Sequence, residues 1–325
     1  MDGLIVYSYN LLLMIKTKTV LVLGAGASYP YGLPLAKELR KQICFEFAPY
    51  FEKLLEGRER NEWRRKEQRE HLQEFTKAFF KSSDRSIDVW LVKNPIFTQI
   101  GKQAISSMIL NGEHKGDLRE KAPHHDQDWY SYLWQRMTDE FTQPDDYKHF
   151  SENEVDFITF NYDRSLDQFL YESLTYAFYD VYSNTYKEII EQLNKRRLIH
   201  VYGQIGPLEW QGSPNLPYGK DPNSVWPRFA SHLKIIYEAE HTSEVEEARK
   251  LIQKAQRIFF LGFGFAKENL EILQIPNILE SQKIYGTAFG LTSIEIAKIS
   301  APLKKQSYKP IIKPLNCLQL LREYL

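Results

Sequence analysis

A glycine-rich turn is the first segment of the sequence whose residue types suit ligand binding. Residues 24–28 read GAGAS and follow the apolar run 18–23, and apolar residues at helical spacing come next, at 34–47. Glycines at the tip of a strand-turn-helix unit let backbone N–H groups approach a phosphate closely. The turn therefore predicts a pyrophosphate site, and close packing of helix on strand is the alternative that stays open.

The turn departs from two familiar phosphate loops. Tyr29 replaces the third glycine of the dinucleotide fingerprint, and no carboxylate ends an obvious second strand about twenty residues further on. No Gly-Lys-Ser/Thr follows, which excludes a Walker loop. An ordinary NAD dehydrogenase is therefore not favoured.

Polar residues accompany two further apolar runs. Asn161 and Asp163 come directly after residues 155–160, and His200 lies within residues 197–202. An asparagine offers a donor and an acceptor, a carboxylate accepts, and a histidine exchanges a proton near neutral pH. Such a set could bind and orient a polar substrate. The alternatives are turn and helix-cap chemistry for Asn161 and Asp163, and a core position for His200.

These polar residues need a scaffold, and the sequence has the pattern of a parallel sheet. Continuous apolar runs at 18–23, 155–160, 197–202, 257–261 and 283–288 are separated by helical patterns. Such runs are typical of strands that are buried on both faces. We predict an α/β fold in which a parallel sheet has helices on both faces.

The chain also divides by composition. Residues 51–150 begin with a heavily charged stretch and carry helical patterns near 86–91, 98–110 and 129–141. We predict an N-terminal leader at 1–18, a core formed by 19–50 and 151–325, and a helical insertion at 51–150. The apolar run 4–15 is too short to span a bilayer and lacks the flanks of a signal peptide.

Composition limits the classes of function. The 325 residues carry 42 Lys and Arg against 42 Asp and Glu, so no net positive charge favours nucleic acid. Cys44 and Cys317 are the two cysteines, which excludes a four-cysteine zinc module, and no HExxH pattern occurs. We predict a cytoplasmic globular protein with no metal site and no membrane association.

The motifs taken in order resemble the Sir2-like family. GAGAS with the following Gly32-Leu33-Pro34, then TFNYD at 159–163, a histidine at the next strand end, and GFGF at 262–265 occur in one order. The family has a Rossmann-like fold, binds NAD and breaks its nicotinamide-ribose bond. The resemblance covers roughly 19–47 and 155–292 and leaves the insertion outside.

Two departures refine what the resemblance implies. Sirtuin deacetylases carry a four-cysteine zinc module, so its lack points to the NAD-hydrolysing Sir2-like proteins of bacterial anti-phage systems. The family has His directly before Gly, whereas residues 200–203 read HVYG. His200 stays the candidate, because residues two apart on a strand face the same side and His200 could share a face with Tyr202.

The resemblance also implies roles for individual residues. Asn161 would bind ribose hydroxyls and place a water, Asp163 would accept from a hydroxyl or brace Asn161, and His200 would take a proton. The residues implied to bind NAD are Gly24, Ala25, Gly26, Ala27, Ser28, Pro34, Thr159, Tyr202, Gly203, Gly262, Phe263 and Gly264.

The leading hypothesis is therefore an NAD glycohydrolase that yields nicotinamide and ADP-ribose, and that depletes cellular NAD as a regulated anti-phage effector. Such an activity needs a gate, which implies a homo-oligomer or a separately encoded ATPase or nucleotide-sensing partner. The alternatives are a non-catalytic module that senses NAD or ADP-ribose and, third, an NAD-dependent protein deacylase. Release of nicotinamide separates the first two hypotheses.

Overall fold

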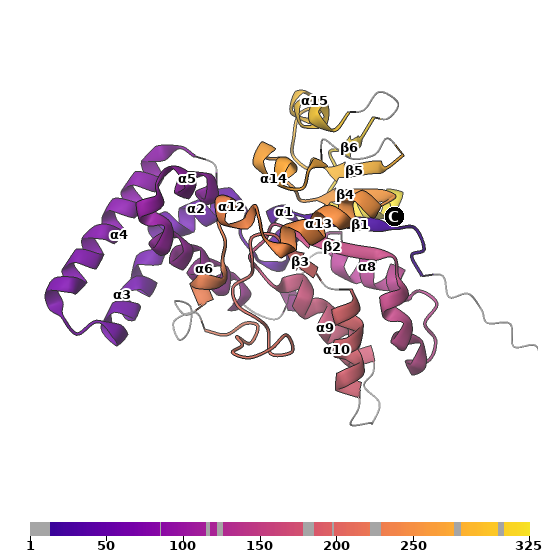
Figure 1. Ribbon diagram of the computed structural model, residues 1–325, viewed down its shortest axis with the longest axis horizontal. Coiled ribbons are helices and arrows are strands. Elements are labelled where there is room, and N and C mark those ends of the chain that lie inside the picture. Colours follow the sequence, from indigo (N-terminus) through magenta and orange to yellow (C-terminus); the bar gives the residue numbers. More distant parts are fainter. Residues whose placement is uncertain are drawn as a thin grey trace, which may run out of the picture.

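The protein is built on a six-stranded sheet in which all strands are parallel. A computed structural model describes residues 14–84, 86–114, 118–121, 126–177, 185–196, 198–221, 229–275, 281–304 and 309–325. The strands are β1 (Thr19–Leu23), β2 (Val155–Thr159), β3 (Leu198–His200), β4 (Arg257–Leu261), β5 (Lys283–Thr287) and β6 (Ile311–Lys313). Their spatial order is β3-β2-β1-β4-β5-β6 (Figure 1). This order confirms the predicted parallel α/β fold.

The central strands are apolar runs that are buried along their length. β1 reads TVLVL with all five residues buried, and β4 reads RIFFL with four of its five residues buried. The register places Leu23, the last residue of β1, opposite Thr159 of β2 and Leu261 of β4. The three strands therefore end at the same level, and the loops that follow them start from one edge of the sheet.

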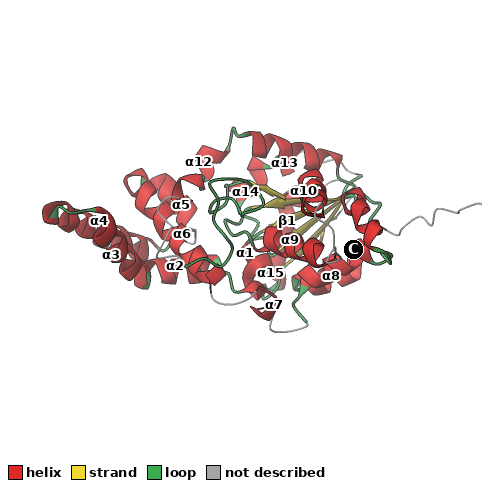
Figure 2. Cartoon of the chain, turned by 90° about the horizontal axis from the view of Figure 1, so that it is seen from below, coloured by secondary structure: helices red, strands yellow, loops and turns green. Residues whose placement is uncertain are grey.

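Helices cover both faces of the sheet (Figure 2). α8 (Trp129–Thr138) packs against α9 (Ser165–Ala177) and α16 (Cys317–Tyr324) on one face, and α10 (Thr185–Lys195) packs on α9. α13 (Ser243–Lys254) lies on the other face, where it contacts β3. This is the Rossmann-like layering that the sequence predicts.

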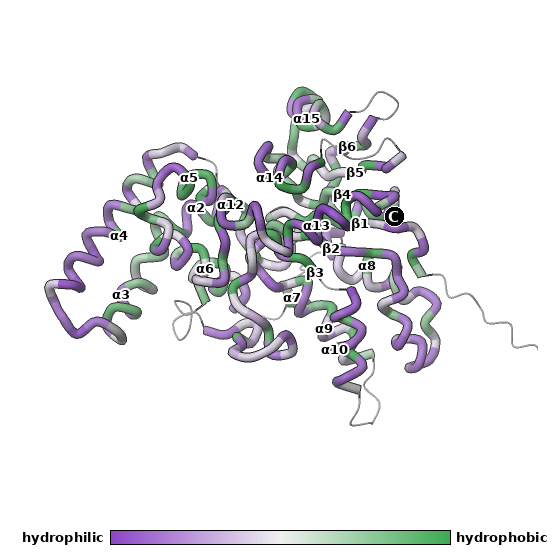
Figure 3. Tube along the Cα trace, viewed as in Figure 1, coloured by the Kyte–Doolittle hydropathy of each residue, from purple (hydrophilic) through white to green (hydrophobic). Residues whose placement is uncertain are grey.

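A helical region extends beyond the carboxyl ends of the strands (Figure 1). It consists of α2 (Ala36–Phe45), α3 (Phe47–Arg58), α4 (Glu62–Ser82), α5 (Ile87–Lys93) and α6 (Thr98–His114). α4 buries Leu72, Phe75 and Phe79 and is hydrophilic along most of its length (Figure 3). The charged stretch of the predicted insertion is thus the solvated face of an amphipathic helix. The segment between β1 and β2 also supplies α8, so it contributes to the sheet layers as well as to the helical region.

The remaining helices in the described ranges are short. They are α1 (Ala25–Ser28), α7 (Leu118–Lys121), α12 (Ile236–Ala239), α14 (Lys267–Ile272) and α15 (Ser293–Ser300), and 3-10 segments include Pro144–Glu152 and Ala230–His232. No helix in the described ranges combines the length and the apolar character needed to cross a bilayer.

Three elements differ from the sequence prediction. The helix expected at 34–47 is divided, because α2 ends at Phe45 and α3 begins at Phe47. β3 ends at His200 and not at residue 202, and β6 was not predicted. Of the predicted leader, residues 1–13 lie outside the described residues. Ile15 is fixed to the core, since its amide donates to the Asn153 side chain at 3.0 Å.

Candidate functional site

The carboxyl edge of the sheet brings together the four segments that the sequence singles out. The amide of Gly24 donates to the carbonyl of Leu261 at 3.0 Å, and the Asn161 side chain donates to the carbonyl of Gly24 at 2.9 Å. The His200 ring lies 3.1 Å from the carbonyl of Asn161. Doubly wound sheets bind ligands at this edge, where the strand order reverses, which here is between β1 and β4.

The two glycine turns pack directly on each other. A Cβ on Gly26 would lie 2.8 Å from the Cα of Gly262, and a Cβ on Gly262 would lie 2.0 Å from the amide nitrogen of Ala27. The amide of Gly26 donates to the carbonyl of Gly262 at 3.0 Å, and that of Ala27 to the carbonyl of Gly24 at 2.8 Å. Close packing therefore accounts for these glycines. A phosphate contact by the Gly26 amide would require the two turns to separate, whereas the Ala27 amide is bound within its own turn.

Asn161 anchors the end of β2 to the glycine turn. Its Nδ2 donates to the carbonyl of Gly24 and to Oγ of Ser28, each at 2.9 Å, and its backbone amide donates to Oγ1 of Thr159 at 3.0 Å. Both side-chain hydrogens are thus in use, while no residue in the described ranges donates to its Oδ1. The half-buried Asn161 offers a ligand an acceptor and not the predicted donor.

His200 is held by acceptors at both ring nitrogens. Nδ1 lies 3.1 Å from the carbonyl oxygen of Asn161, and Nε2 lies 3.1 Å from Oδ2 of Asp167. Only the doubly protonated ring donates to both. Burial lowers the pKa of His200, but the Asp167 carboxylate, its hydrogen bond and the Asn161 carbonyl outweigh burial and raise that pKa above its usual value. This arrangement does not support the predicted role of His200 as a proton acceptor.

Two carboxylates, Asp163 and Asp167, lie near His200 and Asn161, and their contacts differ from those that the sequence indicated. Oδ1 of Asp163 accepts from the amide of Ser165 at 3.1 Å and from its hydroxyl, at the first turn of α9. Asp163 thus has the turn role that the sequence left open among its alternatives. Asp167, one helical turn further, is the residue that contacts His200, and sequence analysis missed it because nothing marks a carboxylate within an apolar helical pattern.

Tyr202 and His200 point to different partners. The Tyr202 hydroxyl donates to Oδ1 of Asn269 in the α14 segment at 2.6 Å, whereas His200 contacts α9. The argument from a shared strand face does not apply, because β3 ends at His200 and a turn follows. Gly203 takes a left-handed conformation in this turn, where a Cβ would lie 2.1 Å from the carbonyl oxygen of His232.

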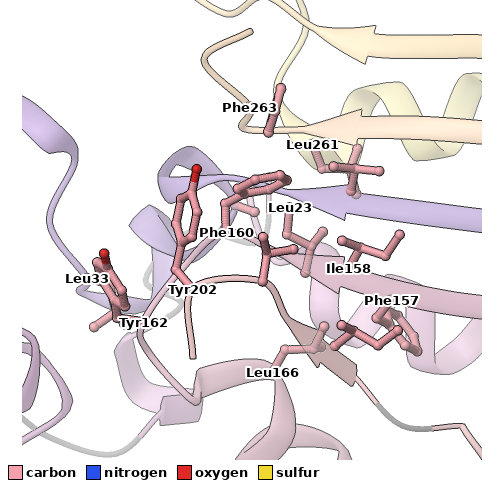
Figure 4. Close-up of a cluster of buried hydrophobic side chains, with 14 of the residues drawn as sticks. Leu23, Leu33, Phe157, Ile158, Phe160, Tyr162, Leu166, Tyr202, Leu261 and Phe263 are labelled. Atoms are coloured by element: carbon pink, nitrogen blue, oxygen red, sulfur yellow. The ribbon is translucent and has the colours of Figure 1, made fainter. Parts of the chain in front are cut away.

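Aromatic side chains line the edge around these polar groups. Phe160 packs edge-on against Tyr202 and against Phe263, with ring centroids 5.3 Å apart in each pair (Figure 4). Tyr162 donates its hydroxyl to Asp88 of α5. Loss of solvation raises the pKa of the Asp88 carboxyl, although hydrogen bonds from Tyr162 and Ser86 act in the opposite direction. The contact gives Asp88 a structural role, which joins the helical region to the sheet.

The other residues implied to bind NAD occupy the same edge in different environments. Ser28 is buried and its hydroxyl accepts from Asn161, and Pro34 is buried before α2. Gly264 is exposed, and a Cβ there would have no heavy atom within 4 Å. Its glycine is therefore not required by packing, in contrast to Gly262.

A cavity of about 620 Å³ lies beside this edge, next to β3. His200 and Asp167 form part of its wall, and further lining residues come from the loop that follows β3. Ligand sites in proteins commonly have volumes of about 300 to 1,000 Å³. The histidine thus separates the edge that carries Asn161 from a space large enough for a small molecule.

Comparisons with known proteins do not assign the site. No protein-family model and no curated protein matches the chain. Within the described residues, no three His, Cys, Asp or Glu side chains gather as ligands of a metal ion would.

Proposed function

We propose that the protein is an NAD glycohydrolase that cleaves the nicotinamide-ribose bond. The observation that carries the proposal is the position of Asn161, whose side chain is fixed to the GAGAS turn by two hydrogen bonds of 2.9 Å. Those bonds leave Oδ1 without a donor among the described residues, at the edge where doubly wound sheets bind nucleotides. The resemblance to the Sir2-like family supplies the substrate, NAD.

The reaction requires the protein mainly to orient the ribose and the attacking water. The bond between the pyridinium nitrogen and C1′ of the ribose breaks, its electron pair leaves with nicotinamide, and the ribose develops oxocarbenium character. A water oxygen then bonds to C1′ and releases a proton to solvent. Asn161 Oδ1 can accept from this water or from a ribose hydroxyl, and either contact places the reacting atoms.

In this scheme His200 acts as a positioning residue. As an imidazolium it donates to the carbonyl of Asn161 and to Asp167, and so it fixes the turn that carries Asn161. A positively charged ring near a developing oxocarbenium would oppose catalysis, but the Asp167 carboxylate neutralises that charge at 3.1 Å.

The second candidate function is a non-catalytic module that binds NAD or ADP-ribose. The two hydrogen bonds of His200 favour it, because they leave neither ring nitrogen free to accept a proton. The packed glycine turns favour it too, since a nucleotide that separates them would change the conformation of the edge.

Regulation is part of the proposal. Unchecked NAD hydrolysis would harm the cell, so we propose that the activity is gated by self-association or by a separately encoded ATPase or nucleotide-sensing partner, as expected of an anti-phage effector. The assay must therefore include the protein alone and with the products of neighbouring genes.

The test is release of nicotinamide from NAD by the wild type and by Asn161→Ala. Loss of a positioned polar group commonly lowers the rate about 10²- to 10³-fold, and we expect a loss of that size. Asn215→Ala, which removes an exposed asparagine side chain, is the matched control and should keep the wild-type rate. Turnover by Asn161→Ala near that of wild type would remove Asn161 from the mechanism. NAD binding without nicotinamide release in every assembly would favour the sensing module.

A further inference from the structure

The hydroxyl of Tyr130, in the first turn of α8, is a buried polar group that the proposed reaction does not use. Tyr130 is 1% exposed, so its hydroxyl depends on protein partners. Its oxygen lies 2.8 Å from Oγ of Ser165, and it has a second hydrogen-bond contact with the hydroxyl of Ser28. Ser28 in turn accepts from the Asn161 side chain at 2.9 Å. The phenol thus lies between the first turn of α9 and the glycine turn that holds Asn161.

The carboxylate of Asp163 sets the direction of these hydrogen bonds. A carboxylate only accepts, so the single hydroxyl hydrogen of Ser165 is donated to Oδ1 of Asp163. Oγ of Ser165 must then accept from Tyr130, which leaves the phenolic oxygen as an acceptor for the Ser28 hydroxyl. Oγ of Ser28 accepts from Nδ2 of Asn161. The chain of donors therefore runs in one direction, from Asn161 to Asp163.

Tyr130 stays a phenol in this chain. Burial raises the pKa of its hydroxyl well above the usual value, and the nearby Asp163 carboxylate adds to this increase. Contacts with the hydroxyls of Ser165 and Ser28 lower that pKa without reversing the shift. Tyr130 therefore keeps its hydrogen near neutral pH, and the chain orients groups without transferring a proton.

The Tyr130 ring is held independently of its hydroxyl. It stacks on Tyr31, with ring centroids 3.7 Å apart and an interplanar angle of 7°. The backbone amide of Tyr130 donates to the Tyr31 hydroxyl at 2.8 Å, and that hydroxyl donates to Asp128 at 2.9 Å. The neighbouring Trp129 donates its indole N–H to the carbonyl of Ala27 at 2.8 Å. Removal of the Tyr130 hydroxyl alone should therefore leave α8 and the glycine turn in place.

The end of the chain at Ser28 affects which end of the Asn161 amide faces the glycine turn. The carbonyl of Gly24 and Oγ of Ser28 both accept from Nδ2, each at 2.9 Å. If the Ser28 hydroxyl hydrogen pointed at Asn161, it would favour the flipped amide, because it could then donate to Oδ1. Acceptance by Tyr130 directs that hydrogen away. Without the phenol the two orientations of the amide compete, and in the flipped one Oδ1 faces the turn.

We propose that Tyr130 is a positioning residue, which keeps Oδ1 of Asn161 free of donors by accepting the hydroxyl hydrogen of Ser28. Its importance for catalysis rests on the proposed NAD hydrolysis, whereas its effect on the Asn161 amide does not. The two are therefore measured separately. Tyr130→Phe removes the hydroxyl and keeps the stacked ring. Tyr132→Phe in the same helix is the matched control, because the Tyr132 hydroxyl makes no hydrogen bond within the described ranges.

The first measurement is the nitrogen–proton correlation of the Asn161 side-chain amide, which is assigned by its loss in Asn161→Ala. In Tyr130→Phe we expect this signal to shift and its hydrogens to exchange with solvent at least about 3-fold faster, the effect of one weakened hydrogen bond. Ser165→Ala should act in the same direction, since the phenol without its acceptor can donate to Ser28 and reverse the chain. Tyr132→Phe should leave the signal unchanged. An unchanged Asn161 signal in a folded Tyr130→Phe, or in a folded Ser165→Ala if the first variant does not fold, overturns the proposal.

The second measurement is the kcat and KM of nicotinamide release. Tyr130→Phe should lower kcat about 3- to 10-fold and change KM less, and Tyr132→Phe should match wild type. In a Ser28→Ala background the competing hydroxyl hydrogen is absent, so Tyr130→Phe should cause no further loss. Additive losses would mean that Tyr130 acts through packing and not through Ser28. If wild type releases no nicotinamide in any assembly, the proposed function fails, and the Asn161 signal alone decides the role of Tyr130.

Discussion

The backbone carbonyl of Asn161 contacts the His200 ring. It thus links the two residues to which the sequence analysis gives the most direct catalytic roles. Asn161 reaches the glycine turn through Nδ2, and His200 reaches Asn161 through its backbone oxygen. A substitution at His200 can therefore alter the position of Asn161 without His200 touching a substrate. Loss of activity in a His200 variant would not by itself make His200 a base, so a measurement of its charge is needed.

The pH dependence of stability provides that measurement. The pKa of folded His200 is raised, so the imidazolium contributes stability that is complete below the unfolded pKa of about 6.5 and is lost as pH rises through the folded pKa. We expect the melting temperature of wild type to exceed that of His200→Gln by the largest margin near pH 6. This margin should shrink towards pH 9. Groups that titrate equally in both proteins cancel in this difference.

The exposed His241 provides the control for that experiment. His241→Gln should leave the pH profile of the melting temperature parallel to that of wild type. A difference between wild type and His200→Gln that grows with pH would mean that folding favours the neutral ring, and would restore His200 as a candidate proton acceptor.

Sequence analysis found the residues of the edge but not their bonds. The types and order of Asn161, His200 and the glycines pointed to one edge of a sheet, and the structure places them there. Asp167 escaped notice because it is 33 residues from His200 and its helix shows only an apolar pattern. The partner of a histidine is set by the packing of α9 on β3, which no local pattern encodes.

At the scale of elements, the turns after β1 and β4 are in direct contact. This contact limits how far the two turns can separate. Gly262 has a φ of 55°, a left-handed conformation, and its backbone touches that of Gly26 and Ala27. Its amide also donates to Oγ1 of Thr287 at 2.8 Å. The turn is thus tied to β5 as well as to α1, and a side chain at this glycine would have no direction in which to move.

A pair of alanine substitutions in this turn tests the packing explanation. Gly262→Ala adds a left-handed strain of about 1 to 2 kcal/mol and a Cβ placed 2.0 Å from the Ala27 nitrogen, so we expect it to lower the free energy of unfolding by more than about 2 kcal/mol. Gly264→Ala meets open space and should change that free energy by less than about 0.5 kcal/mol. Denaturant titration measures both. Equal stability of the two variants would contradict the packing explanation.

The strands that were predicted with the right bounds are continuous apolar runs. The strand that was missed is not such a run. Residues 155–159 and 257–261 are short, mainly apolar runs, and their length and the turn residues that follow them indicate buried strands. β6 has three residues, IIK, too few for a pattern, and it forms because Ile312 pairs with Gly286 at the edge of β5. The end of β3 at His200 is likewise fixed by Gly203, whose left-handed turn brings the chain against His232.

The whole molecule depends on contacts between the helical region and the sheet layers. Asp88 of α5 accepts from the hydroxyl of Tyr162, which follows β2. A second contact is an ion pair between Arg164, before α9, and Glu113 at the end of α6, with both side chains fully inaccessible. Its partners are 51 residues apart in sequence, so only the folded chain reveals it.

Removal of either charge from this pair should be far more harmful than removal of both. Burial raises the pKa of Glu113, and Arg164 opposes that shift, which means that the carboxylate depends on the guanidinium for its charge. Arg164→Met leaves a buried carboxylate and removes bonds to the carbonyls of Gly206 and Leu216, so we expect a loss of about 3 to 5 kcal/mol in the free energy of unfolding. Glu113→Leu alone should cost a similar amount, since it leaves an unpaired buried cation.

The double variant Arg164→Met, Glu113→Leu separates charge burial from simple loss of packing. Without an uncompensated charge it should be more stable than either single variant, although the carbonyls freed from Arg164 keep it below wild type. Lys66→Met, which breaks a solvent-exposed pair with Glu70 on α4, is the control and should cost at most about 1 kcal/mol. If the two core losses simply add in the double variant, the pair does not couple the helical region to the sheet, and the link must rest on contacts such as Asp88 with Tyr162.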